Sequence, residues 1–114
     1  MKGPWHIGAR AAGELPLPEG RRSAEVLRHG SLEVRHYAPQ GNDPQTPHGR
    51  DEVYIVASGQ GSFVRGAEQV VFGPGDMLFV PAGVEHRFED FSDDFATWVM
   101  FYGPEGGERE NPFV

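Results

Sequence analysis

The stretch GDMLFVPAGVEHRF, residues 75–88, decides the fold of this chain. A short apolar run at 77–80 is followed by Pro81 and Gly83, which set a tight turn that re-aims the chain. His86 then lies near the start of the next strand and points to a defined side, because successive side chains of a strand alternate between its two faces. The pattern predicts two short strands joined by a tight turn.

A second stretch, TPHGRDEVYIVASGQG at residues 46–61, has a similar organisation. His48 ends an irregular loop that runs from 39 to 50, with three prolines and two glycines, and loops of this kind are often functional. Glu52 follows four positions later, at the start of an apolar strand, and Gly59 closes the hairpin. The sequence therefore delivers a histidine and a carboxylate to the beginning of one strand.

Similar short runs, rich in Val, Phe, Tyr and Ile, fill the rest of the chain from residue 23 and are separated by turn residues. Gly and Pro, at 16 and 10 of 114 residues, nearly exclude long helices. The spacing predicts an all-β sandwich, jelly roll or barrel. The expected strands are 24–27, 32–37, 53–57, 62–65, 69–72, 77–80, 84–88 and 95–102.

The domain organisation is expected to be simple, since 114 residues fit one compact domain. Residues 1–22 contain prolines and glycines without periodicity and end in Arg21 and Arg22, so they are interpreted as an irregular N-terminal arm. Such an arm could lie across a neighbouring subunit or be mobile. The domain itself is assigned to residues 23–114.

Composition excludes several classes of function. The net charge of −7 disfavours a nucleic-acid partner, because the average surface repels phosphate. The absence of cysteine excludes disulfides and thiolate ligands, and it is compatible with a reducing compartment. No signal peptide or membrane-spanning segment is visible, so we expect a soluble, cytoplasmic protein without a membrane partner.

Together, the two stretches resemble the two signature motifs of the cupin superfamily, over about residues 31–102. The fifteen residues between Gly59 and Gly75 suit the short spacing of small microbial cupins. The resemblance implies a single-domain double-stranded β-helix, or jelly-roll barrel. It also implies a divalent transition metal, with His48, Glu52 and His86 in the positions of ligands.

One ligand position departs from the family pattern, because Thr46 stands where cupins usually have a further histidine. Gln45, one residue earlier, could supply a carbonyl oxygen as a weak fourth ligand, or water could take that place. Two imidazoles and one carboxylate remain a facial triad with open positions for Fe(II), and are also compatible with Zn, Mn or Ni. The alternative is a barrel that has lost its ion.

Strand alternation places Tyr54 and Val56 on the face of Glu52, and Val84 and Phe88 on the face of His86. The expected pocket is mainly apolar with one phenol, and Tyr54 is the candidate for proton transfer, although it could equally be a packed core residue. His36 alternates with apolar residues and is more simply a satisfied polar side chain than a pocket residue.

Two functions follow as hypotheses. The first is a metalloenzyme of dioxygenase, isomerase or lyase type, acting on a small oxygen-bearing molecule. The second is a non-catalytic barrel that binds a sugar or metabolite, with or without metal, because this fold hosts both classes. The resemblance also implies a homodimer, because cupins commonly pair through an edge strand or a swapped N-terminal segment. The apolar strand at 95–102 and the arm are its expected contacts.

Overall fold

The computed structural model describes residues 1–109 of the chain, and the last five residues of the expected domain lie outside this range. It contains one short helix, α1 (Ala9–Gly13), followed by eight strands. The strands are β1 (Ser23–His29), β2 (Leu32–Tyr37), β3 (Asp51–Ser58), β4 (Gly61–Arg65), β5 (Glu68–Phe72), β6 (Met77–Val80), β7 (His86–Glu89) and β8 (Ala96–Tyr102).

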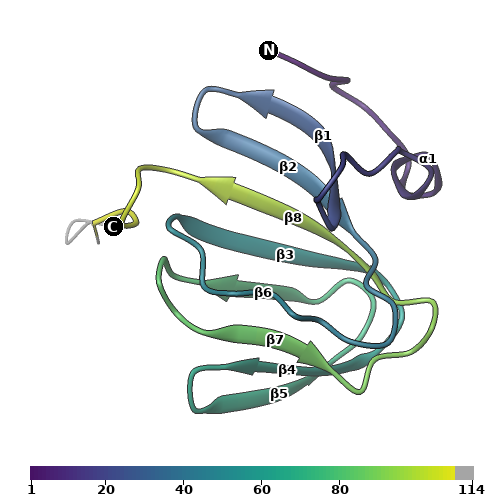
Figure 1. Ribbon diagram of the computed structural model, residues 1–114, viewed down its shortest axis with the longest axis vertical. Coiled ribbons are helices and arrows are strands. Elements are labelled where there is room, and N and C mark those ends of the chain that lie inside the picture. Colours follow the sequence, from purple (N-terminus) through teal and green to yellow (C-terminus); the bar gives the residue numbers. More distant parts are fainter. Residues whose placement is uncertain (110–114) are drawn as a thin grey trace.

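Two antiparallel sheets make up the domain (Figure 1). The larger has the order β1-β2-β8-β3-β6, and the smaller has the order β5-β4-β7. Aromatic side chains from both sheets meet in the core, where the ring of Phe88 lies 4.9 Å from that of Tyr54 and 4.7 Å from that of Phe95, centroid to centroid. The expected all-β barrel is confirmed.

Every strand starts and ends within two residues of its expected position, and two of the differences bear on the site. Strand β3 begins two residues earlier than expected, because Asp51 and Glu52 pair with Tyr102 and Phe101 of β8. Strand β7 begins at His86, since Val84 still belongs to the turn, where its amide lies 3.3 Å from the Pro81 carbonyl. Glu52 is thus held inside a paired strand.

Strand β8 is not available as an edge for dimer contacts, which corrects the expectation for residues 95–102. It lies between β2 and β3 and pairs with both along most of its length. The edges of the larger sheet are β1 and β6 instead. The sequence of β8, ATWVMFY, is apolar except at Thr97 and fits a central position in the sheet.

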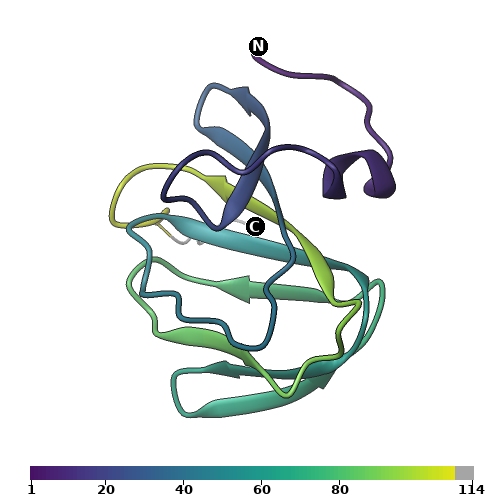
Figure 2. The ribbon, with the colours of Figure 1, turned by 45° about the vertical axis from the view of Figure 1, so that its right-hand side comes forward.

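Residues 1–22, expected to be irregular, include α1 and a bridge between Lys2 and Arg28 of β1. The helix packs on β1 and β2 through Ala12, which is 1% exposed, and Figure 2 shows this segment outside the larger sheet. A helix of five residues leaves too little periodicity to be visible in the sequence. No helix in the described residues is long and apolar enough to cross a membrane.

Candidate metal centre

The turn at Pro81–Gly83 brings the two motif stretches together. The Gly83 amide donates to the His48 carbonyl at 2.8 Å, and the Ala82 amide donates to Asp51 Oδ1 at 3.0 Å. These bonds tie the turn before β7 to the residues that flank the start of β3. The side chains of His48, Glu52 and His86 consequently meet at one end of the barrel.

The three side chains form a compact group of possible ligands. One nitrogen or oxygen from each lies within 4.8 Å of the others, and among the described residues this is the group that could hold a metal ion. Ligands of one ion, each about 2.0–2.2 Å from it, lie within about 4.4 Å of one another. The observed spread is therefore close to that of a bound site.

Glu52 carries a buried oxygen that lacks a hydrogen bond. Its side chain is 2% exposed, and Oε1 has no hydrogen-bond partner although it lies 3.1 Å from His86 Nε2. A buried carboxylate oxygen without a partner is costly unless a cation compensates it. The donor set and this orphaned oxygen both fit a divalent ion.

The tautomer of His86 also suits metal binding. Its Nδ1 lies 2.9 Å from the Val84 carbonyl and donates to it, which leaves the Nε2 lone pair directed at Glu52. Burial lowers the pKa of His86, but the Glu52 carboxylate and the Val84 carbonyl outweigh this effect and raise it above its usual value. A positive charge at this position, whether proton or metal, is favoured by its surroundings.

His48 approaches from the long loop and differs from His86 in its environment. Its side chain is one-third exposed and its ring contacts Phe101 edge-on, with centroids 5.1 Å apart. Burial lowers the pKa of His48, so its imidazole is neutral and can act as a ligand at neutral pH. Its Nε2 lies 3.9 Å from Glu52 Oε1.

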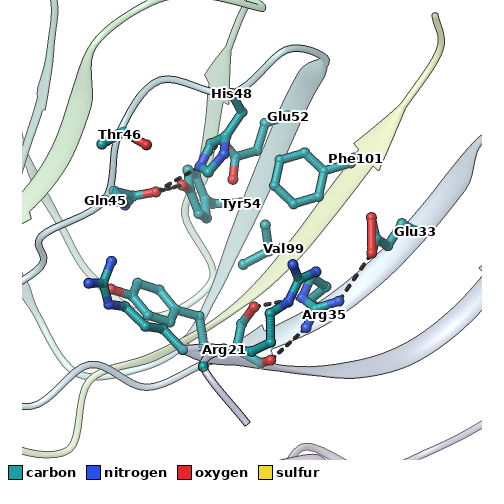
Figure 3. Close-up of a pocket in the computed structure, with 14 residues that line it drawn as sticks. Arg21, Glu33, Arg35, Gln45, Thr46, His48, Glu52, Tyr54, Val99 and Phe101 are labelled. Carbon is teal, nitrogen blue, oxygen red and sulfur yellow. Dashed lines mark hydrogen bonds and ion pairs between the residues drawn. The ribbon is translucent and has the colours of Figure 1, made fainter. Parts of the chain in front are cut away.

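Gln45 points its amide oxygen toward His48 and Tyr54, as Figure 3 shows. Its Oε1 lies 3.1 Å from the Nε2 atoms of both His48 and His86, and it accepts a hydrogen bond from the Tyr54 hydroxyl at 3.1 Å. Thr46 lines the pocket but is exposed. The amide oxygen of Gln45 is thus directed at the same point as the candidate ligands.

Asp43, which the sequence analysis does not single out, fixes the orientation of Gln45. Its carboxylate accepts hydrogen bonds from Gln45 Nε2 at 2.6 Å, from the Tyr37 hydroxyl and from the Phe88 amide at 2.8 Å. Because Nε2 of Gln45 is bound to Asp43, Oε1 must face the histidines. The signal in the sequence is weak, since an Asp before Pro also fits an ordinary turn.

Tyr54 lies on the same buried face of β3 as Glu52 and Val56, as expected from strand alternation. Its hydroxyl is 3.1 Å from His86 Nε2. Burial, and then the charge of Glu52, raise the pKa of Tyr54 well above its usual value, so it stays a neutral phenol that can donate a proton. Phe88 packs against its ring, whereas Val84 is only partly buried in the turn.

Residues 33–102 match the cupin domain family. The chain belongs to the cupins. A relative from Streptomyces coelicolor, an uncharacterized protein, is 39% identical over 83 residues, which cover 71% of this chain and 79% of the relative.

Two solved structures extend the comparison. A cupin-2 domain protein from Shewanella frigidimarina is 17% identical, with a TM-score of 0.66 over 85% of this chain and 94% of that chain. A chain from a study of DMSP lyases is 27% identical, with a TM-score of 0.58 over 68% of this chain and 41% of that chain. The first shows that the two proteins share a fold.

Proposed function

We propose that this cupin binds one divalent transition metal, Fe, Mn, Ni or Zn, through His48, Glu52 and His86. Gln45 Oε1 is the proposed fourth ligand. The observation that carries the proposal is the partnerless buried oxygen of Glu52, which faces two imidazole nitrogens in the group of possible ligands. A bound ion would act as a Lewis acid or as a site for dioxygen.

The reaction proposed is of dioxygenase, isomerase or lyase type on a small molecule. Tyr54 would hold a proton at its hydroxyl and give it to the substrate, because burial keeps the phenol neutral. Phe101 and Val99 line the pocket beside the ligands and would limit the access of water. The similarity to DMSP lyases supports the lyase type in particular.

Metal content tests the first part of this proposal. We expect elemental mass spectrometry of tag-free protein to find about one transition-metal ion per chain, after reconstitution if necessary. Absence of metal under every loading condition would contradict the proposal. Bound iron would lead to oxygen-consumption assays, and another metal would lead to isomerase and lyase assays.

A metal-free binding protein is the second candidate. It is favoured by the hydrogen bonds that Gln45 Oε1 makes or shares with Tyr54, His48 and His86, because these side chains then partly satisfy one another without an ion. In that case a small sugar or metabolite would bind in the pocket without turnover. Tight ligand binding by protein shown to contain no metal would support it.

The orientation of Gln45 by Asp43 gives a prediction about metal affinity. In Asp43→Ala, both acceptor oxygens are removed, so Gln45 Nε2 loses the partner that fixes the orientation of its side chain. We expect metal affinity to fall about tenfold, as for other residues that orient a ligand. Titration with Co(II) measures this, and its absorption spectrum should also change. Asp93→Ala, at an exposed acid, is the matched control. Equal affinities and spectra in the two variants would show that Asp43 does not orient a ligand.

We also propose a homodimer. The support is a set of exposed apolar side chains on β5 and β6, which lie in different sheets. Val71 is 83% and Met77 60% exposed, and Val70 and Met77 line the same hollow. Light scattering at micromolar concentration should give twice the chain mass of 12.6 kDa, and a monomer mass would contradict the proposal. The cytoplasmic location stays a prediction.

A further inference from the structure

The pocket beside the candidate ligands has two chemically different ends (Figure 3). It has a volume of about 320 Å³, at the small end of the range for ligand sites, which suits a small molecule. Gln45, His48 and Glu52 lie at one end. The other end is lined by Arg35 of β2 and by Arg21 and Arg22, the last two residues of the N-terminal arm.

The negative charge of Glu33, at this second end, is neutralised by several arginines. Glu33 accepts from Arg28 at 2.7 Å, from Arg35 at 3.1 Å and from Arg50 at 3.0 Å. Three guanidinium groups thus share one carboxylate, and Arg28 alone has a further acidic partner, Glu25. The pocket lining itself holds three arginines, Arg21, Arg22 and Arg35, and two acidic residues, Glu33 and Glu52. This is a positive excess in a chain whose net charge is −7.

Arg35 is the buried member of this group. Its side chain is 5% exposed, and it is held by the hydroxyl and the carbonyl of Ser23, each at 2.6 Å, as well as by Glu33. These contacts use three of its five N–H groups, because Nε, Nη1 and Nη2 each donate once. The remaining two can serve a ligand in the pocket that Arg35 lines.

Arg21 and Arg22 add two exposed charges at the rim. Neither makes an ion pair within residues 1–109, and Arg22 Nη1 lies only 3.5 Å from the Pro44 carbonyl of the loop that carries Gln45. Positive groups that converge on a low-dielectric pocket raise the local concentration of anions. The arm therefore supplies charge to the pocket.

The strand register sets the separation between the two ends. Arg35 pairs with Val99, and Val99 pairs with Tyr54, so these three residues form one row across β2, β8 and β3. Two strand spacings amount to roughly 10 Å between the backbones of Arg35 and Tyr54. A small molecule with functional groups at both ends can span this distance.

We propose that the pocket binds a small organic anion, with its carboxylate or phosphate at Arg21, Arg22 and Arg35 and its other end at the His48–Glu52–His86 group. This inference deepens the proposed function by naming the class of its substrate. Guanidinium groups recognise the paired oxygens of carboxylate and phosphate in the same way. The Glu52 end, where an ion would bind, receives the reacting group.

Binding of simple probes tests the inference. Succinate and methyl phosphate are titrated into the protein by calorimetry at low salt, with succinamide as the uncharged counterpart of succinate. We expect at least one anion to bind and succinamide not to bind. In the double variant Arg21→Ala/Arg22→Ala, anion affinity should fall about tenfold or more, because charge-assisted hydrogen bonds at the rim are lost.

The control is Arg10→Ala/Arg87→Ala, which removes the same charge from exposed arginines outside the pocket. It should keep wild-type affinity for the anion. Equal binding of succinate and succinamide, failure of both anions, or equal losses in the two double variants would overturn the inference.

The same titrations on metal-free and metal-loaded protein separate the two proposals. Anion binding that depends on Arg21 and Arg22 in a protein that takes up no metal would contradict the proposed metal centre alone. Metal uptake without preference for anions would contradict the anion site alone. The Arg21→Ala/Arg22→Ala variant should keep its full metal content, since neither arginine contacts His48, Glu52 or His86.

Discussion

His86→Ala is expected to remove bound metal from the protein. The Nε2 of His86 lies 3.1 Å from Glu52 Oε1 and from Gln45 Oε1, so its imidazole is at the centre of the candidate site. Loss of a side chain that merely orients a ligand weakens metal sites by about 10–100-fold, and loss of a ligand itself should exceed about 100-fold. Elemental analysis beside wild type measures the effect.

A matched control separates ligand loss from damage to the fold. His36 is also buried, with 6% of its surface exposed. It lies on the face of β2 that points away from the pocket, and its ring packs against Trp98 with centroids 5.5 Å apart. His36→Ala should keep the metal. His48→Ala removes a half-buried loop side chain at little cost in packing and should lose metal as His86→Ala does. Full occupancy in both His48→Ala and His86→Ala would disprove the assignment.

Local chemistry made the fold predictable. Pro81 and Gly83 fix a turn whatever surrounds them, and strand alternation then determines which side chains accompany Glu52. The candidate ligands themselves came from the resemblance to cupins. The structure brings them together through long-range backbone hydrogen bonds, such as the one from the Gly83 amide to the His48 carbonyl. Local sequence patterns do not predict such bonds.

Strand β2 shows why the far end of the pocket was missed. The sequence pattern of β2 predicts that the face with Leu32 and Val34 points into the barrel. In the structure the other face, with Glu33, Arg35 and Tyr37, lines the pocket. Polar side chains are tolerated inside because each of them has a hydrogen-bonding partner. The charge balance of this cluster depends on Arg28 and Arg50, which come from different parts of the chain.

The position of β8 shows a second limit of sequence reasoning. Its aromatic residues suit an edge contact between subunits as well as a central strand, because both bury apolar side chains. Only the pairing with β2 and β3 distinguishes these possibilities. Strand order depends on long-range pairing, which residue preferences do not encode.

Glu52→Gln should change stability and metal affinity in opposite directions. In the metal-free protein with His86 neutral, Glu52 Oε1 is a buried acceptor that faces the His86 Nε2 lone pair at 3.1 Å. The amide nitrogen of glutamine can instead donate to Nε2 with almost no change in volume. Relief of an unsatisfied buried group contributes about 1–3 kcal/mol, so the metal-free variant should melt several degrees above metal-free wild type.

The metal-loaded proteins should show the reverse order. A neutral amide is a much weaker ligand than a carboxylate for a divalent ion, so Glu52→Gln should bind metal poorly and gain little stability from it. Melting curves with and without Zn(II) measure both effects, and they are repeated at increasing pH because the pKa of His86 is raised. Glu33→Gln is the control, because Glu33 is equally a buried carboxylate but is held by three arginines, and its loss should destabilise the protein with or without metal. If Glu52→Gln instead destabilised the metal-free protein as Glu33→Gln does, the Glu52 carboxylate would be structural, and the case for a metal centre would lose its main support.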